Sequence, residues 1–170
     1  MDRLWTPWRY QYITGEGVKK AADLDASPDA SCIFCTLPQE DPAQDERNFI
    51  IHRARHNFIV LNLYPYTSGH LLVIPYEHTS ELDTVAKATT DELMDLTKRA
   101  QTILRAAYVP DGFNLGMNLG RAAGAGVAGH IHLHIMPRWA GDANFMSTVA
   151  ETRVLPEDLP TTYKRLRGQF

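Results

Sequence analysis

The feature that most constrains the fold is a strict alternation of histidines with apolar residues near the C-terminal third of the chain. The alternating residues are His130, Ile131, His132, Leu133, His134 and Ile135. On a β-strand, residues i, i+2 and i+4 share one face, with side chains roughly 6–7 Å apart. We therefore expect the three imidazoles on one face and the apolar side chains in a core. Because a row of imidazoles is costly to bury without partners, the alternatives are a functional cluster or a solvent-facing edge strand, and the strict alternation favours the cluster.

Length and charge narrow the class of protein further. The 170 residues are enough for one domain with a core. The net charge of −3 shows no excess of basic residues of the kind that binds nucleic acid. No apolar run approaches the ~20 residues that span a bilayer, and the N-terminus does not resemble a signal peptide. We expect a cytoplasmic protein without nucleic-acid or membrane partners. We also expect an aromatic N-terminal arm over residues 1–30 and a single domain over residues 31–170.

The two cysteines, Cys32 and Cys35, form a C-x-x-C pair. In a reducing cytoplasm such a pair is a metal half-site or a redox pair more often than a structural disulfide. Two buried free thiols are the remaining alternative.

Periodicity and turn residues predict the elements. A helix starts at Thr90 as its cap and ends before Pro110, and a glycine- and alanine-rich loop over residues 119–129 precedes the histidine strand. Other strands are expected over residues 48–52, 58–62, 70–74 and 113–118, a weak helix over 80–88, and a terminal helix over 156–166. The predicted fold is α+β, with a five-stranded antiparallel sheet, one long helix and a shorter C-terminal helix.

These elements, in this order, resemble the histidine triad (HIT) superfamily of nucleotide hydrolases and transferases. The resemblance rests on a Gly-His-apolar strand ending at Pro75, the long helix, the Asn118-Leu119-Gly120 strand end, the small-residue loop and the triad. It covers roughly residues 32–138, so the HIT fold is expected. Residues 137–145 (P-R-W-A-G-D-A-N-F) and 4–9 also resemble a longer, zinc-bearing branch that includes diadenosine tetraphosphate phosphorylases.

The resemblance assigns roles to the histidines. It makes His132 the nucleophile that attacks a phosphorus, with His134 hydrogen-bonding a phosphate oxygen or the leaving group and His70 supporting the triad. It also implies a structural zinc ion bound by Cys32, Cys35, His78 and His130, which would hold the His130 ring beside the nucleophile.

The nucleotide-binding residues are likewise implied by the resemblance. They are Asn62, Asn118, Gly120, Gly124, Gly126 and Asn144. Asn62 could equally be a turn residue at a strand end, and Asn144 could build a turn with Asp142. Many family members carry Gln and Ser or Thr in the phosphate loop, whereas residues 123–127 read A-G-A-G-V here. Backbone amides, His134 or Arg121 are the hypothesised substitutes.

The implied activity is cleavage of dinucleoside polyphosphates, of the diadenosine tetraphosphate type, at the α-phosphate. A nucleotidyl-His132 intermediate would be released by water or by inorganic phosphate. The alternatives are a nucleoside phosphoramidase or adenylyl-amine hydrolase, and a nucleotide-binding module with little catalysis. The expected partners are a purine nucleotide and, by analogy with the family, a second copy of the chain.

Overall fold

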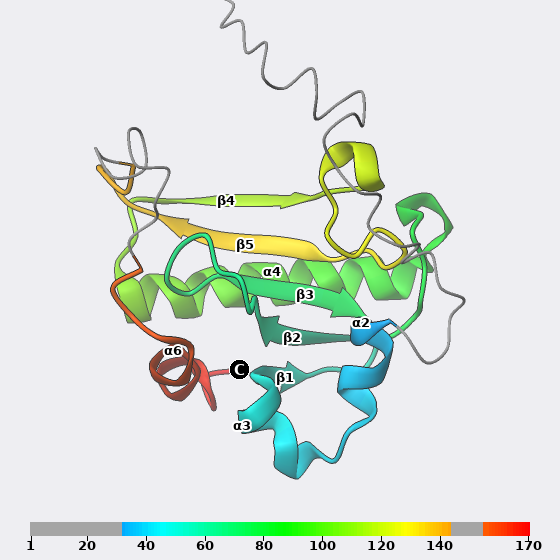
Figure 1. Cartoon of the computed structure of the whole chain (residues 1–170), viewed down its shortest axis with the longest axis horizontal. Helices are drawn as coiled ribbons and strands as arrows, with labels where there is room; N and C mark the ends of the chain where they lie inside the picture. Colours follow the sequence, from blue (N-terminus) through cyan, green and yellow to red (C-terminus); the bar gives the residue numbers. More distant parts are fainter. Residues whose placement is uncertain (1–31, 144–154) are drawn as a thin grey trace, which may run out of the picture.

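The protein is built on one antiparallel sheet of five strands in the order β1-β2-β3-β5-β4 (Figure 1). The structure, a computed structural model, describes residues 32–143 and 155–170. The strands are β1 (Ile50–Arg53), β2 (Asn57–Leu61), β3 (Leu71–Pro75), β4 (Gly112–Met117) and β5 (Leu133–Arg138). The predicted α+β fold with a five-stranded antiparallel sheet is confirmed.

The strand order places the histidine strand in the sheet interior. β5 is paired with β3 on one side and with β4 on the other, both antiparallel. All five residues of β2 and β3 are buried, which fits their Val-, Ile- and Leu-rich composition. Strand β5 is therefore hydrogen-bonded to a neighbouring strand on each side.

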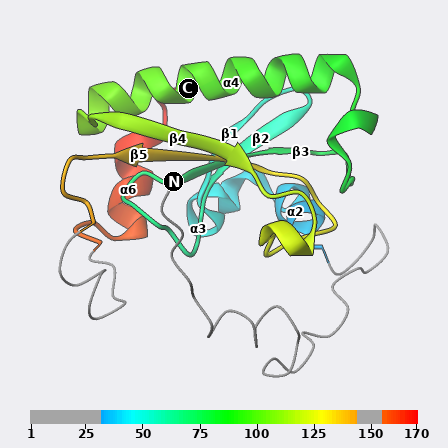
Figure 2. The same ribbon diagram turned by 90° about the horizontal axis from the view of Figure 1, so that it is seen from above.

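A long helix, α4 (Lys87–Tyr108), packs across one face of the sheet. Figure 2 shows α4 on one side of the sheet, with α2 (Ile33–Thr36) and α3 (Asp45–Asn48) on the other. A further helix, α6 (Leu159–Leu166), lies by the β1 side of the sheet and contributes Tyr163 and Leu166 to the core beneath α4. The core under α4 contains apolar residues of the central strands, of α4 and of α6: Ile59, Leu61, Leu71, Val73, Leu93, Leu96, Ala100, Leu104, Leu133, Ile135, Tyr163 and Leu166.

The start of the long helix differs from the prediction. α4 begins at Lys87 after Ala86, whose carbonyl accepts hydrogen bonds from the N–H groups of Thr89 and Thr90. Thr90 is thus inside the first turn and is not the cap. The weak helix expected over residues 80–88 is only a short 3₁₀ turn, Leu82–Thr84.

The histidine strand also starts later than predicted. Regular pairing begins at Leu133, because the Ile131 N–H donates to the carbonyl of Thr79 outside the sheet. The Pro75 carbonyl at the end of β3 lies 2.9 Å from Nε2 of His130. Residues 130–132 therefore continue the strand direction but leave the ladder, so their backbone carbonyls are available to side chains.

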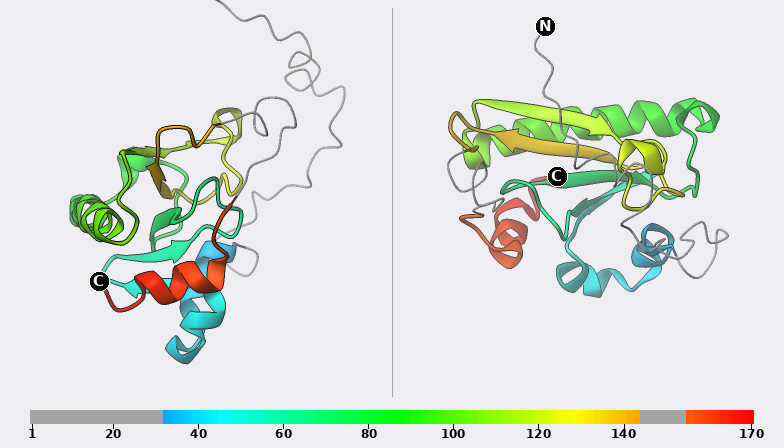
Figure 3. Two further views of the ribbon diagram at one scale, coloured as in Figure 1. Left: turned by 90° about the vertical axis from the view of Figure 1, so that its left-hand side faces the viewer. Right: turned by 45° about the horizontal axis from the view of Figure 1, so that its top comes forward.

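The C-terminal helix α6 is confirmed, and Figure 3 shows it lying near α3 at the β1 side of the sheet. Its N-cap is Asp158, which accepts a hydrogen bond from the N–H of Thr161. None of the helices in the described residues is long and apolar enough to cross a membrane. The predicted N-terminal arm, residues 1–30, lies outside the described residues.

Candidate active site and metal centre

The three histidines of the alternation form one buried cluster. His130, His132 and His134 are 0%, 5% and 9% exposed. The rings of His132 and His134 lie 4.9 Å apart between centroids, and the Phe34 ring of α2 packs 5.1 Å from the ring of His132. The solvent-facing alternative is therefore wrong, because α2 covers this face of the sheet.

The hydrogen bond made by His132 defines its tautomer. Its Nδ1 lies 2.9 Å from the backbone carbonyl oxygen of His130. A carbonyl oxygen only accepts, so Nδ1 carries the proton and Nε2 keeps a lone pair. This carbonyl is available because residues 130–132 leave the ladder. His132 is thus a neutral imidazole whose Nε2 can act as a nucleophile.

A second hydrogen-bond chain defines the tautomer of His134. The backbone N–H of Tyr66 donates to Nδ1 of His70 at 3.2 Å, so the proton of His70 is on Nε2. That Nε2 lies 2.9 Å from Nδ1 of His134 and donates to it. His134 therefore carries its proton on Nε2, an atom that is buried and has no hydrogen-bond partner in the described part of the chain. It is a donor that remains available for a hydrogen bond.

Burial keeps these imidazoles neutral. Desolvation lowers the pKa of His132 and, with the nearby His132 ring, lowers the pKa of His134 to about 4. At neutral pH both rings are therefore uncharged. One presents a lone pair and the other presents an N–H group, which is the pairing that attack on a phosphorus and stabilisation of a departing oxygen require.

The four predicted metal ligands come together in one cluster. The Sγ of Cys35 lies 3.1 Å from Nδ1 of His78 and 3.5 Å from Nδ1 of His130, and the Sγ of Cys32 lies 3.4 Å from Nδ1 of His130. All four ligand atoms are within 4.8 Å of one another. A tetrahedral zinc site with bonds of about 2.0–2.3 Å has edges of roughly 3.3–3.8 Å, so the donor set and its spacing fit a metal ion.

His130 joins the metal cluster to the triad. Its Nε2–H donates to the Pro75 carbonyl at 2.9 Å, which leaves the Nδ1 lone pair facing the two thiols. Its own backbone carbonyl accepts the proton of His132. A metal ion held by this ring would therefore fix the residue that orients His132.

Of the predicted nucleotide-binding residues, Asn62 contacts one of the site histidines. Nδ2 of Asn62 lies 3.4 Å from Nδ1 of His70. The β4–β5 register ends at the pair Met117 and Leu133, and Asn118 is the residue that follows this last pair on the β4 side. Gly120 and Gly124 adopt φ angles of +78° and +90°, which favour glycine. Gly126 and Arg121 are exposed in the same loop, and Asn144 lies outside the described residues.

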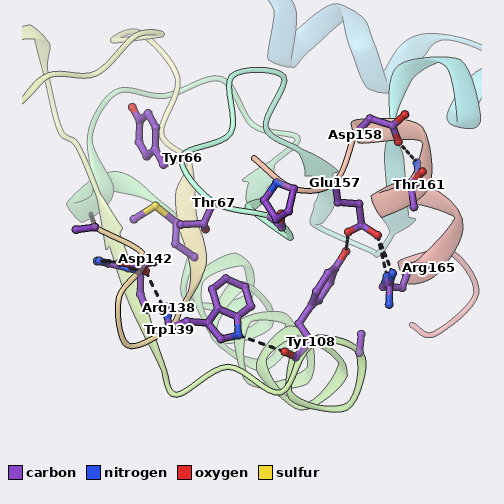
Figure 4. A pocket seen from close by; sticks show the side chains of 15 residues that line it. Tyr66, Thr67, Tyr108, Arg138, Trp139, Asp142, Glu157, Asp158, Thr161 and Arg165 are labelled. Carbon is purple, nitrogen blue, oxygen red and sulfur yellow. Dashed lines mark hydrogen bonds and ion pairs between the residues drawn. The ribbon is translucent and has the colours of Figure 1, made fainter. Parts of the chain in front are cut away.

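A cavity of about 1290 Å³, which no sequence pattern predicts, lies beyond the triad at the C-terminal end of β5 (Figure 4). None of the triad histidines lines it. Its lining includes Tyr66, Thr67, Ser68, Tyr108, Met136, Arg138, Trp139, Asp142, Glu157 and Arg165. The alternation of His134, Met136 and Arg138 along β5 could have predicted that these side chains share one face. The side chains that α6 adds to the lining could not have been predicted, because α6 is distant in the sequence.

A buried triad with complementary tautomers, on the central strands of an antiparallel sheet and beside a Cys₂His₂ cluster, defines a histidine triad protein. The chain belongs to the HIT family, whose HIT domain matches residues 43–141. It is an enzyme of this family, as the sequence predicted.

Two comparisons place it within the family. It is 40% identical over 170 residues to the "AP-4-A phosphorylase" of Mycobacterium tuberculosis H37Rv, covering 100% of this chain and 85% of that protein. The structure of a Zn-bound histidine triad family protein from Mycobacterium smegmatis superposes with a TM-score of 0.65 at 31% identity, covering 82% of this chain and 92% of that one.

Proposed function

We propose that this enzyme cleaves dinucleoside polyphosphates of the diadenosine tetraphosphate type at the α-phosphate. The observation that carries the proposal is the complementary pair of imidazole tautomers, with a lone pair on Nε2 of His132 and an N–H on Nε2 of His134. The full-length similarity to an AP-4-A phosphorylase supports the class of substrate.

In the first step Nε2 of His132 attacks the α-phosphorus. A P–N bond forms, the bond to the bridging oxygen breaks, and the departing phosphate takes the electron pair of that oxygen. Nε2–H of His134 donates a hydrogen bond to the oxygen on which charge develops. The imidazolium formed on His132 is stabilised because its Nδ1–H already donates to the His130 carbonyl.

In the second step an acceptor attacks the nucleotidyl-His132 intermediate and releases the neutral imidazole. Water yields a nucleoside monophosphate and inorganic phosphate yields a nucleoside diphosphate. The proposed contacts to the nucleotide are those predicted from the sequence, with the backbone of the small-residue loop and Arg121 in place of the family's Gln and Ser or Thr side chains. The proposed contact residues are Asn62, Asn118, Gly120, Gly124, Gly126 and Asn144.

We further propose that the metal of the Cys₂His₂ cluster is zinc and that its role is structural. Cys32, Cys35, His78 and His130 fill all four positions of a tetrahedral site, so no position is left for water or substrate. When bound, the ion would hold α2 against the residues that lead into β5 and would fix the ring of His130.

The remaining proposals concern assembly and location. We propose one domain over residues 31–170, a cytoplasmic location and a homodimer. The dimer is supported by β4, which is an edge strand of the sheet with Leu115 45% exposed. An exposed edge strand with an apolar side chain is a ready site for pairing with another chain.

Product analysis tests the activity. The protein is incubated with diadenosine tetraphosphate, with and without labelled inorganic phosphate, and separately with adenosine phosphoramidate. Labelled ADP identifies a phosphorylase, and AMP without label identifies a hydrolase. Cleavage of the phosphoramidate alone would replace the proposal by the amine-hydrolase alternative, and tight AMP binding without turnover would favour a binding module.

A further inference from the structure

The cavity at the end of β5 continues the face of the sheet that carries the triad. His134, Met136 and Arg138 alternate along β5, so their side chains share one face. His134 belongs to the triad, whereas Met136 and Arg138 line the cavity. Four residues at the rise of a strand put the far end of the cavity roughly 13 Å from His134. A substrate bound at His132 and extending along β5 would reach it.

The charged groups of the cavity are already paired with one another. Nη2 of Arg138 lies 2.7 Å from Oδ1 of Asp142, and Nη2 of Arg165 lies 2.8 Å from Oε1 of Glu157. The hydroxyl of Tyr108 donates to the other oxygen of Glu157 at 2.5 Å, as Figure 4 shows. Because each arginine has a carboxylate partner, the cavity offers no excess positive charge for a polyphosphate. It suits an uncharged group.

The remaining lining offers rings and unused hydrogen-bonding groups. The hydroxyls of Thr67 and Ser68 are buried and have no hydrogen-bond partner within residues 32–143 and 155–170. The Tyr66 ring is 45% exposed and stacks against His134, with centroids 6.3 Å apart and planes at 22°. Buried polar groups without partners are rare in folded proteins and indicate a ligand or water.

We propose that this cavity binds the nucleoside of the departing half of the dinucleoside polyphosphate. The inference rests on the proposed function, and it identifies the part of the substrate that distinguishes a dinucleotide from a mononucleotide. A nucleoside is uncharged and has one aromatic base and several hydroxyls. The cavity, at about 1290 Å³, is larger than the roughly 300–1000 Å³ of ordinary ligand pockets and therefore has room for it.

Tyr66 links the cavity to the hydrogen bonds of the histidine cluster. Its ring borders the cavity, and its backbone N–H donates to Nδ1 of His70. A nucleoside packed on Tyr66 would therefore hold the segment that defines the tautomer of His134. The departing half would contribute to orienting the donor that assists its own release.

Steady-state kinetics test the inference with two substrates that share the scissile bond. Diadenosine tetraphosphate carries the distal nucleoside and adenosine 5′-tetraphosphate lacks it. The double variant Thr67→Val/Ser68→Ala removes both hydroxyls, and Ala107→Trp fills the cavity from α4. Thr102→Val is the matched control, since Thr102 is exposed on α4 and bonds only to the Lys98 carbonyl.

The kcat/KM ratio of the dinucleotide to the mononucleotide is expected to fall about tenfold in the double variant, as two hydrogen bonds are lost. It should fall further in Ala107→Trp and stay unchanged in Thr102→Val. Circular dichroism and melting temperature establish that each variant is folded. An unchanged ratio in folded Ala107→Trp, together with unchanged activity on both substrates, overturns the inference and leaves the proposed function intact.

Binding of adenosine gives a second readout that needs no turnover. With AMP saturating the site beside His132, calorimetry should detect one further equivalent of adenosine, with affinity reduced about tenfold in Thr67→Val/Ser68→Ala. If the protein cleaves neither substrate yet binds this adenosine, the proposed function fails and nucleoside recognition by the cavity stands. If no second adenosine binds to the unmodified protein, the cavity is not a nucleoside site.

Discussion

At the residue scale, the hydrogen-bond partner of Nδ1 fixes the tautomer of His132 and of His134. The His130 carbonyl holds the proton of His132 on Nδ1, and the Tyr66 N–H, through His70, holds the proton of His134 on Nε2. Residues of the same type, two positions apart, thereby have opposite hydrogen-bonding groups at Nε2, a lone pair on His132 and an N–H on His134. The His130 carbonyl comes from the same segment as His132, whereas the Tyr66 N–H and the His70 ring that act on His134 come from the turn before β3.

Replacing His132 by Asn tests the nucleophile. The variant lacks the Nε2 lone pair, so kcat for diadenosine tetraphosphate should fall by roughly 10³-fold or more. AMP affinity, measured by calorimetry, should remain within a few-fold of that of the unmodified protein. His56→Asn, on the β1–β2 turn, is the matched control. Turnover by His132→Asn at the control rate would remove His132 from the mechanism.

The low pKa of His134 predicts how stability depends on pH. Its folded pKa is about 4 and its unfolded value is about 6.5, so between these values the unfolded chain binds more protons. The free energy of unfolding should therefore be constant above pH 6.5 and should fall as the pH drops from 6.5 to 4. Urea titrations at pH 7.5 and 5 measure the loss, which should be smaller in His134→Gln. An equal loss in both proteins would assign it to other groups.

At the element scale, two local arrangements position the active site: the metal cluster between α2 and β5, and the turn between β2 and β3. The cluster joins Cys32 and Cys35, at the start of α2, to His130 at the approach to β5. The turn brings Tyr66 and Gly69 to His70. The four-residue α2 is held both by this cluster and by the buried Phe34 ring, which packs in an apolar cluster with residues of β1, β2 and β3.

Chelation tests the metal cluster. Zinc should be found by elemental analysis in protein purified without added metal, at one ion per chain. Its removal should lower the melting temperature by several degrees, because about 1 kcal/mol shifts the midpoint of a chain this size by roughly 2–4 °C. Cys35→Ser should show the same loss, and Ser80→Ala should not. Metal-free protein with an unchanged melting temperature would refute a structural zinc ion.

The turn before β3 depends on Gly69. This residue has φ +75°, and an added Cβ would lie 3.1 Å from Cδ2 of Leu104 and 3.2 Å from Cε2 of Tyr108. Gly69→Ala should therefore reduce the free energy of unfolding by about 1–3 kcal/mol. Gly112→Ala, with no atom within 4 Å of the added Cβ, is the control. Urea denaturation measures both, and equal stabilities would show that the turn adapts.

At the scale of the whole molecule, α4 and its side of the core cover one sheet face, and the histidine cluster lies on the opposite face (Figure 2). The two sheet edges differ. Contacts of α6 and the C-terminal residues lie near β1, where the His52 ring stacks on Phe170, whereas β4 ends the sheet on the other side. This asymmetry makes β4 the edge at which a second copy is expected.

Sedimentation tests the proposed homodimer. The unmodified protein should sediment as a dimer at micromolar concentration, and Leu115→Lys should shift it towards monomer, because a charged side chain on an edge strand opposes pairing. Leu82→Lys, 38% exposed on a 3₁₀ turn, should leave the dimer intact. A monomeric unmodified protein, or a dimer unaffected by Leu115→Lys, would exclude pairing through β4.

Local pattern in the sequence predicted the elements well where one periodicity dominated. The β-strands and the apolar stripe of α4 were predicted because burial of one face imposes a period of two or of 3.6 residues. The start of α4 was missed because Ala86 caps it through its backbone carbonyl, without a side-chain signal. The break before Leu133 was missed because the Pro75 carbonyl and the Thr79 carbonyl belong to another strand and loop.

The sequence alone determined which chemical groups the protein has and which face of each strand they occupy, because side-chain period is a property of the backbone. It also supplied the Cys₂His₂ set through the family resemblance. Only the tertiary structure decided the tautomers of His132 and His134 and the cavity beyond them. The His130 carbonyl is close to His132 in the sequence, but contacts of residues 130 and 131 with Pro75 and Thr79 take this stretch out of the ladder. The group that fixes His134 and the walls of the cavity come from distant segments, whose distances no linear pattern encodes.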